Sequence, residues 1–120
     1  MDKNESREDY LEAVLQLISE GKRHRSIDVA RKLGFSKPSV SVAVKKLRQE
    51  GFVYVLDDGT IELTNEGKTI AENTLNKHIF LTEFFVRIGV NPTNAEEQAC
   101  KIEHDISEDT FQKLKKFLEK

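Results

Sequence analysis

The sequence contains little cysteine and no long hydrophobic run, and each absence excludes a class of protein. Its 120 residues include a single cysteine, Cys100, which excludes an intrachain disulfide. No apolar stretch approaches the roughly 18 residues that a membrane-spanning helix requires. The opening residues MDKNESRED lack the basic and apolar segments of a secretion signal. We therefore expect a cytoplasmic protein with no membrane partner.

Length and composition favour a small globular fold without a substrate pocket. Hydrophobic residues make up 38% of the chain and charged residues 33%, which is polar for a folded domain but well above the apolar content of a disordered chain. A chain of this length holds one compact domain, or a small head joined to a short second module. We therefore expect neither an enzyme nor a small organic substrate.

Charge is distributed unevenly along the chain. The formal net charge is −2, yet the segment from Lys22 to Arg48 holds nine lysine or arginine residues and one acidic residue, Asp28. Such a basic segment produces a local field suited to phosphates. A solvated helical surface without a ligand fits the charge equally well, so the secondary structure has to decide between them.

The first half of the chain predicts three helices. Apolar residues recur at helical spacing over residues 7–20, and Gly21 follows as a stop. Ser26 is expected to cap a short second helix that Gly34 ends, with an apolar face made of Ile27, Ala30 and Leu33. Ser36 is expected to cap a third helix. Two short helices joined by a tight glycine-containing turn are typical of the helix-turn-helix.

The third helix has the composition of a DNA-reading helix. Val40, Ala43, Val44 and Leu47 form its buried stripe, so small and cationic side chains face outward. Short side chains allow a close approach in the major groove, and cations further along hold phosphates. We therefore expect double-stranded DNA as a partner. The expected contact residues are Arg25, Ser36, Lys37, Pro38, Ser39, Ser41, Val42, Lys45 and Lys46.

A β-hairpin is predicted after the third helix. Residues 52–56 and 61–63 are rich in β-forming side chains, and Asp58-Gly59 between them signals a tight turn. Three helices followed by a hairpin is the winged-helix order. We place a DNA-binding domain at residues 1–64, although a small α+β domain without a DNA role remains the alternative.

A long helix is expected from Asn65 to Ile88, with Thr64 as its cap. Its latter half is apolar on more than one stripe, which suggests burial against a second subunit and hence a homodimer. The residues concerned are Phe80, Leu81, Phe84, Phe85, Val86 and Ile88.

Two shorter helices should follow. One is expected to begin with Thr93 or Asn94 as its cap and to run to about His104, and Ser107 starts the other. The fold class is therefore mainly α with a small β-hairpin, in which residues 65–120 form a helical second domain.

Cys100, Glu103 and His104 form the most distinctive polar cluster. Their spacing of i, i+3 and i+4 places all three side chains on one face of a helix. A thiolate, a carboxylate and an imidazole are all competent ligands for a divalent transition metal. The alternative is a buried thiol beside two exposed polar residues.

Four short motifs occur in a fixed order along the chain. They are Glu8-Asp9-Tyr10-Leu11-Glu12, Ser36-Lys37-Pro38-Ser39-Val40-Ser41, Lys77-His78, and Ala99-Cys100-Lys101-Ile102-Glu103-His104 before Ser107. Together they resemble the diphtheria toxin repressor family of iron- and manganese-dependent regulators over nearly the whole chain. The resemblance implies a winged helix-turn-helix head and a helical metal-binding and dimerisation domain.

The resemblance implies six metal ligands. Cys100, Glu103 and His104 match the principal ligands, and Asp9 matches the ligand from the first helix. Glu12 matches a carboxylate of the manganese-sensing branch, and His78 matches a ligand of both branches. Apart from the resemblance, Asp9 and Glu12 fit an ordinary acidic helix start, and His78 fits a polar residue on a dimer helix.

Departures from the family pattern bear on the metal and on the operator. Cys100 resembles the iron-sensing branch, whereas Asp9 and Glu12 resemble the manganese branch. Because a thiolate shifts preference away from Mn²⁺, we rank Fe²⁺ first and Mn²⁺ second, with Zn²⁺ or Co²⁺ able to bind in vitro. Thr82 and Glu96 stand where the family has ligands of an ancillary site, so we do not expect a complete second site.

Val42 stands where some relatives of the family carry a base-reading glutamine. A valine can touch a thymine methyl group but cannot form a bidentate hydrogen bond to a base. The operator is therefore expected to differ from those that the glutamine reads.

The sequence predicts a metal-dependent DNA-binding repressor. In this hypothesis Fe or Mn is a co-repressor that ties the first helix to the second domain and orders a dimer on a palindromic operator. A metal-independent winged-helix regulator with Cys100 as a redox sensor is the alternative. A metalloenzyme built on the same ligands is a further alternative, for which the chain leaves little room.

Overall fold

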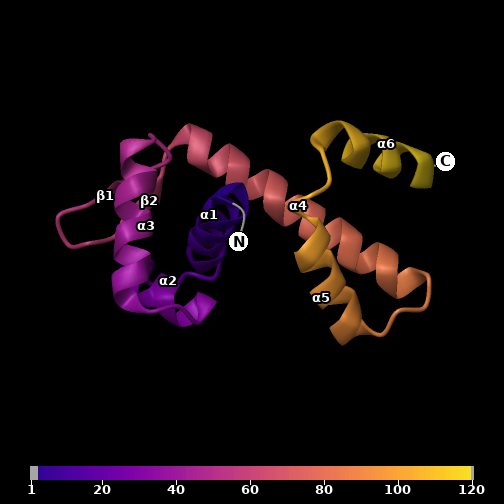
Figure 1. The fold of residues 1–120 in the computed structure, drawn as a ribbon, viewed down its shortest axis with the longest axis horizontal. Coiled ribbons are helices and arrows are strands. Elements are labelled where there is room, and N and C mark those ends of the chain that lie inside the picture. Colours follow the sequence, from indigo (N-terminus) through magenta and orange to yellow (C-terminus); the bar gives the residue numbers. More distant parts are fainter. Residues whose placement is uncertain (1–2, 120) are drawn as a thin grey trace. The chain divides into compact units, whose positions relative to one another are not determined.

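The computed structural model describes residues 3–119, with side chains from Arg7 onward. The elements in chain order are α1 (Lys3–Ser19), α2 (Ser26–Leu33), α3 (Lys37–Gln49), β1 (Val53–Val55), β2 (Ile61–Leu63), α4 (Asn65–Arg87), α5 (Pro92–Ile102) and α6 (Glu108–Leu118). They are labelled in Figure 1. The predicted fold class, mainly α with a small β-hairpin, is confirmed. No helix among the described residues is both long enough and apolar enough to cross a membrane.

The described chain divides into two compact units within α4, between Asn73 and Thr74. The first unit contains the three N-terminal helices, the hairpin and the start of α4, and the second contains the remainder of α4 with α5 and α6. The division at residue 64 suggested by the sequence stays a prediction.

The first unit encloses one hydrophobic core. Leu11 and Val14 from α1, Val29 from α2, Val40 from α3 and Ile61 from β2 are almost completely buried. Helix α2 packs on α3, and both contact α1, while the hairpin lies against α3 and α1 (Figure 1). Three helices and a hairpin therefore share a single core, which confirms the winged-helix order predicted from the sequence.

The start of α2 differs from the prediction. Arg25, not Ser26, is the N-cap, and its backbone N–H donates to Oδ2 of Asp28 at 2.9 Å. The carboxylate of Asp28 also lies in the first turn, where it interacts favourably with the helix dipole. Of the predicted apolar face, Ala30 is buried and Leu33 packs against the core, but Ile27 is 37% exposed and Val29, which was not predicted, is completely buried.

The start of α3 matches the prediction. Oγ of Ser36 accepts the backbone N–H of Ser39 at 3.3 Å, and Pro38 occupies the first turn, where a missing N–H is tolerated. Gly34 adopts a positive φ of 74° in the turn between α2 and α3, a conformation that glycine adopts without strain. The predicted helix-turn-helix is therefore confirmed.

The hairpin pairs β1 with β2 in antiparallel register, with Val53 opposite Leu63 and Val55 opposite Ile61. In the turn, the backbone N–H of Leu56 donates to the carbonyl of Thr60 at 2.9 Å. Gly59 has a φ of 90°, which explains the glycine at this position. The predicted turn and the bounds of the second strand are confirmed, and the first strand is shorter than the predicted residues 52–56.

Helix α4 begins at the predicted cap. Oγ1 of Thr64 accepts the backbone N–H of Gly67 at 3.1 Å. Gly67 is buried, and a β-carbon at this position would collide with the backbone carbonyl of Phe52. The first turn of α4 therefore approaches the chain before β1 as closely as a glycine allows.

In the second unit, α4, α5 and α6 enclose a smaller core. Leu81, Ala95, Ala99 and Phe111 are almost completely buried, and the rings of Phe80 and Phe111 meet edge to face at 5.4 Å. Ser107 caps α6 as predicted, accepting the N–H of Thr110 at 3.1 Å.

The predicted start and end of α5 need correction. Asn91, not Thr93 or Asn94, is its N-cap, with Oδ1 accepting the backbone N–H of Asn94 at 3.0 Å. Pro92 follows at the first helical position, which suits its fixed φ. At the other end the helix stops at Ile102, so that His104 lies in the turn that follows.

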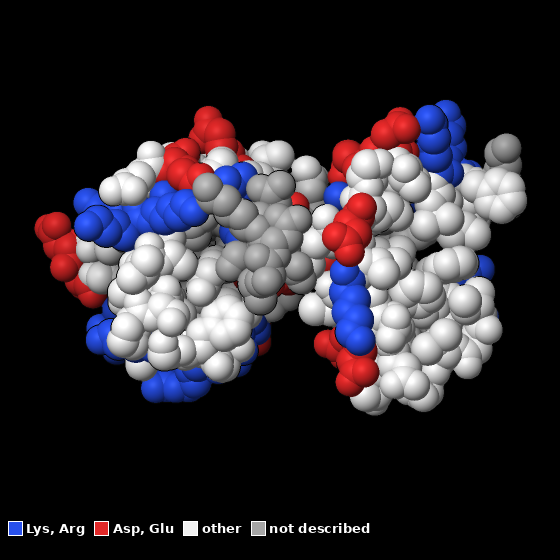
Figure 2. Space-filling model, viewed as in Figure 1, with Lys and Arg blue, Asp and Glu red and all other residues white. Residues whose placement is uncertain are grey.

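The latter part of α4 keeps apolar side chains on its surface. Ile79 is 47% exposed, Val86 is 42% exposed and Ile88, just beyond the helix, is 62% exposed. In Figure 2 the surface beside α5, toward the end of α4, is largely without charged side chains. The six residues predicted for a subunit contact are not all alike, however, since Leu81 is buried within this unit.

Replacing Gly67 with alanine should reduce the free energy of unfolding by about 1–3 kcal/mol, because the new β-carbon has to displace the Phe52 backbone. Alanine in an open helix would instead stabilise by up to about 1 kcal/mol relative to glycine. Chemical denaturation of the metal-free protein measures the difference. Glu66→Ala, an exposed change on the same turn, is the control, and a stabilised G67A variant would contradict the close approach.

Candidate metal centre and DNA-binding surface

The carboxylate of Glu103 is the most deeply buried charged group described in the second unit. Glu103 is the C-cap of α5, and its backbone N–H donates to the carbonyl of Ala99 at 3.0 Å. Only 1% of the residue is exposed to solvent. A carboxylate at this depth requires positive partners, because desolvating a lone ionised carboxylate costs several kcal/mol.

Two imidazoles flank this carboxylate. Nδ1 of His78, on α4, lies 2.8 Å from Oε2 of Glu103, and Nε2 of His104 lies 3.4 Å from Oε1. The side chain of His78 is 20% exposed and that of His104 only 3%. The group therefore joins α4 to the turn after α5, within the second unit.

The oxygen atoms of Glu103 differ in how well they are satisfied. Oε2 has the short contact with His78, whereas Oε1 is buried and has no hydrogen-bond partner among the described residues. A buried carboxylate oxygen without a hydrogen bond is rare in folded proteins. Imidazole nitrogen and carboxylate oxygen are ligand atoms for divalent transition metals. The donor set and the unsatisfied oxygen thus fit a cation.

Cys100, the remaining member of the predicted trio, is exposed on the last turn of α5. Its spacing from Glu103 and His104 was expected to bring all three side chains to one helix face. The helix ends at Ile102, Glu103 follows as its C-cap with helical dihedral angles, and His104 lies in the turn beyond. The role of Cys100 as a ligand stays a prediction.

Asp9 and Glu12 belong to α1, in the first unit, and both are half-buried. They are separated by three residues along the helix and so share a face, as the sequence predicted. Burial, together with the neighbouring Asp9 carboxylate, raises the pKa of Tyr10 above its usual value. Their role as ligands stays a prediction.

The expectation that a second site is incomplete stays a prediction. Oγ1 of Thr82 donates to the backbone carbonyl of His78 at 2.7 Å, one turn back on α4. Glu96 is exposed on α5. The bond from Thr82 gives the hydroxyl a role within its own helix.

The outward face of α3 is arranged as expected for DNA reading. Val40, Val44 and Leu47 are buried in the core, which fixes the orientation of the helix. Val42 is 71% exposed. The other predicted contact residues of this region that are also exposed are Ser36, Lys37, Pro38, Ser39, Ser41, Lys45 and Lys46. In Figure 2 lysine and arginine side chains lie at several places around the first unit.

Arg25 is the predicted DNA contact that the structure embeds most deeply. It is half-buried, forms an isolated antiparallel bridge with Thr60 and therefore lies beside the hairpin turn. In that turn, Oδ1 of Asp58 accepts the backbone N–H of Thr60 at 2.9 Å. That bond to Thr60, with a smaller contribution from the charge of Arg25, lowers the pKa of Asp58.

Comparisons with known proteins account for both halves of the chain. Residues 3–60 match the N-terminal DNA binding domain of the iron dependent repressors, and residues 64–120 match the metal binding and dimerisation domain of the same family. The chain belongs to the iron-dependent repressor family. The resemblance inferred from the four motifs is thereby confirmed, and with it the assignment to metal-dependent, DNA-binding transcriptional repressors.

Members of the iron-dependent repressor family resemble the chain over most of its length. The transcriptional regulator MntR of Escherichia coli O157:H7 is 32% identical over 113 residues, which cover 94% of this chain and 73% of MntR. An uncharacterised HTH-type transcriptional regulator of Methanocaldococcus jannaschii is 36% identical over 122 aligned residues, covering 98% of this chain and 95% of the relative.

A solved structure of the manganese regulator SloR superposes with a TM-score of 0.84 and 29% sequence identity. The match covers 99% of this chain and 55% of the SloR chain, so the present chain spans about half the length of that relative. Both units thus have the fold of an iron-dependent repressor.

Sequence reasoning missed one group of contacts in this repressor fold. His24 and Glu62 are joined at 3.3 Å between the segment before α2 and strand β2. The two residues are separated by 38 positions, and neither belongs to a recognisable motif. Helical or strand periodicity carries no signal for such a pair.

Replacing Glu103 with glutamine should weaken the binding of a divalent cation by at least about 10- to 100-fold, because the side chain keeps its size but loses its negative charge. Competition against a metal-sensitive chelating dye, with the metal-free protein, measures the affinity. Glu97→Gln, an exposed change on the same helix, provides the matched control. Equal affinities of the two variants would exclude Glu103 as a ligand.

Proposed function

We propose that this chain is a transcriptional repressor whose affinity for DNA is set by a divalent cation bound at Glu103. The observation that carries the proposal is the buried carboxylate flanked by His78 and His104, one oxygen of which has no hydrogen bond within the described part of the chain. A bound cation supplies the positive charge that this carboxylate requires and a set of fixed coordination directions.

The proposed ligand set extends beyond these three residues. Cys100 supports it as an exposed thiol three positions before Glu103. Asp9 and Glu12 support it as carboxylates on one face of α1. By sharing the cation, these carboxylates and the His78–Glu103–His104 group hold α1 and the helical half in one arrangement.

We rank Fe²⁺ first and Mn²⁺ second as the physiological cation. A thiolate favours iron over manganese, while carboxylates and imidazoles accept both. Zn²⁺ and Co²⁺ are expected to bind in vitro. The thiol and imidazole groups have to release protons in order to coordinate, so occupancy should fall in acid.

Double-stranded DNA is the proposed partner, and a homodimer is the proposed DNA-binding form. Exposed Ile79, Val86 and Ile88 supply an apolar surface near the end of α4 for contact with a second copy. Two α3 helices in a dimer could enter successive major grooves about 34 Å apart on a palindromic operator.

Val42 gives this recognition helix a distinct preference among the DNA bases. At 71% exposure it is an apolar side chain that gains nothing from water. The thymine methyl is the apolar group that bases present in the major groove. We therefore infer that Val42 contacts thymine, with Ser39 and Ser41 allowing the close approach and Lys45 and Lys46 holding phosphates.

The proposed metal switch requires only a modest difference in free energy between the metal-free and metal-bound protein. When only a fraction of the molecules has the DNA-binding arrangement, the apparent affinity falls by that fraction. A cation present at about 100 times its dissociation constant stabilises the bound arrangement by about 2.7 kcal/mol, or roughly a hundredfold in population. No enzymatic step and no organic substrate is required, and we place this activity in the cytoplasm.

The proposal is tested by first selecting an operator from random double-stranded DNA with the metal-loaded protein, and then measuring its affinity anaerobically. Fe²⁺ or Mn²⁺ should increase the affinity by about tenfold to a hundredfold, and a chelator should reverse the change. The selected site should be palindromic and contain thymine opposite Val42. DNA binding that neither metal nor chelator alters would contradict the metal switch.

Two variants separate this proposal from the redox alternative, which the exposure of Cys100 favours. If the metal proposal holds, Glu103→Gln should abolish the response of DNA binding to metal. Neither the wild type nor this variant should then respond to oxidant. In a redox sensor, Cys100→Ser would instead remove a response to peroxide, while Glu103→Gln would have no effect.

A further inference from the structure

The hairpin of the first unit is too short to hold its position alone. Strands β1 and β2 contain three residues each and form a sheet of only two strands. An isolated two-stranded hairpin is marginally stable in water. The position of the hairpin beside α3 therefore depends on contacts with other segments.

The segment immediately before α2 provides such contacts through its backbone. The N–H of Ile61 donates to the carbonyl of His24 at 2.9 Å, and Arg25 pairs with Thr60 in an antiparallel bridge. Residues 24 and 25 thus lie along the free edge of β2. The same Arg25 is the N-cap of α2, so this segment joins the hairpin to the helix-turn-helix.

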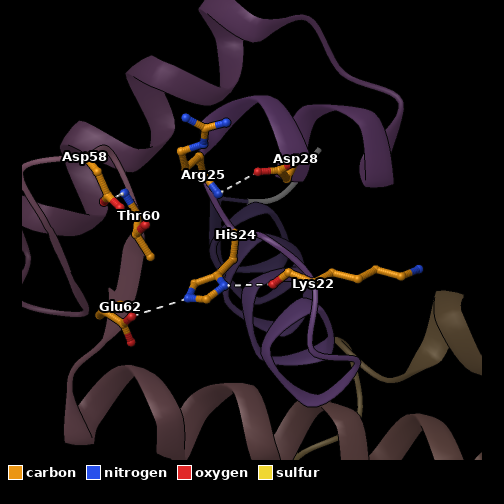
Figure 3. A network of polar contacts seen from close by, with 7 residues as sticks. All are labelled: Lys22, His24, Arg25, Asp28, Asp58, Thr60 and Glu62. Carbon is orange, nitrogen blue, oxygen red and sulfur yellow. Dashed lines mark hydrogen bonds and ion pairs between the residues drawn. The ribbon is translucent and has the colours of Figure 1, made fainter.

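His24 adds a side-chain contact at this junction (Figure 3). Its Nε2 lies 3.3 Å from Oε1 of Glu62 on β2, and its Nδ1 lies 3.1 Å from the backbone carbonyl of Lys22. In Figure 3 the ring lies between these two groups. The His24 side chain is 18% exposed and that of Glu62 is 32% exposed, so the pair is partly shielded from water.

The chemistry of the two contacts identifies the form of the ring that fits them. A backbone carbonyl and a carboxylate both accept hydrogen bonds and donate none. Each ring nitrogen therefore has to carry a proton if both contacts are to be hydrogen bonds. The doubly protonated ring donates to both groups, and its positive charge is paired with the negative charge of Glu62. The bond to Glu62 is then charge-assisted, and such bonds are about twice as strong as neutral ones.

Packing at the tip of the hairpin reinforces the junction. A β-carbon at Gly59 would lie 3.6 Å from Cδ of Arg25, so the stem of the arginine covers the turn. Asp58 is held within the turn by its hydrogen bond to Thr60. The turn and the strand thus have separate contacts with the segment of residues 24–25.

We propose that the His24–Glu62 pair is a latch that fixes the hairpin against the segment leading into α2, so that hairpin and recognition helix meet DNA as one rigid unit. His24 is a positioning residue in this account. The proposal rests on the proposed function for its effect on DNA, while the latch itself is a property of the first unit.

The test uses two variants that interrupt the pair in different ways. His24→Asn keeps an amide donor near the position of Nδ1, and so near the carbonyl of Lys22, but lacks Nε2. Glu62→Gln keeps an acceptor oxygen and removes the charge. Glu72→Gln makes the same change of charge at an exposed position on α4 and is the matched control.

Backbone order parameters of residues 57–60, measured by NMR on the metal-free protein, report on the latch directly. They should be high in the wild type and in E72Q and lower in H24N and E62Q, while the melting temperature stays close to that of the wild type. Metal is left out so that the comparison does not depend on its binding.

Operator affinity with saturating Mn²⁺ gives the consequence for DNA. H24N and E62Q should each lose about three- to tenfold, the size expected for the net contribution of one ordinary hydrogen bond. The double variant should lose no more than either single variant. Order parameters or affinities equal to those of E72Q, or additive losses in the double variant, would overturn the proposal. A wild type that binds no DNA would refute the proposed function, and the NMR comparison would still decide the latch.

Discussion

A buried negative charge is the constraint on which the helical half of this protein depends. The carboxylate of Glu103 is 1% exposed and lies between two imidazoles, one from α4 and one from the turn after α5. Removing such a group from water is costly unless positive charge and hydrogen bonds compensate for it. Because one oxygen has no hydrogen bond from the described residues, a cation would complete the compensation. In the proposed repressor, the same charge that makes this half dependent on metal makes it a sensor of metal.

The DNA-reading half depends on a different constraint, the orientation of α3. Val40, Val44 and Leu47 fix one face of the helix in the core, which leaves the small and cationic side chains exposed. The chain before α2 is joined to the hairpin by Ile61, Thr60 and Glu62. The hairpin and the recognition helix are therefore supported by one another. Such preorganisation reduces the conformational free energy that is lost on binding DNA. It suits a protein whose affinity for DNA is proposed to be set elsewhere, by the binding of a cation.

Sequence reasoning succeeded where the chemistry is local. Ser36, Thr64 and Ser107 cap the helices for which they were predicted, because a hydroxyl and a nearby N–H suffice. It failed where more than one neighbouring residue could serve as the N-cap. Asn91 caps α5 in place of Thr93 or Asn94, and Arg25 rather than Ser26 is the N-cap of α2. Spacing predicted that Glu103 and His104 act together, but not that the carboxylate is buried against His78, 25 positions away. That contact depends on how α4 and α5 pack, and the family resemblance was its only signal in the sequence.

The claim at the centre of this account is that Glu103 binds a cation directly. Anomalous diffraction at the manganese edge, from crystals of the protein loaded with Mn²⁺, tests it without reference to DNA or to activity. The account predicts an anomalous peak in direct coordination with Glu103 and with at least one of the flanking imidazoles, together with a carboxylate from α1. A manganese peak elsewhere, with the carboxylate of Glu103 still held only by His78 and His104, would contradict it.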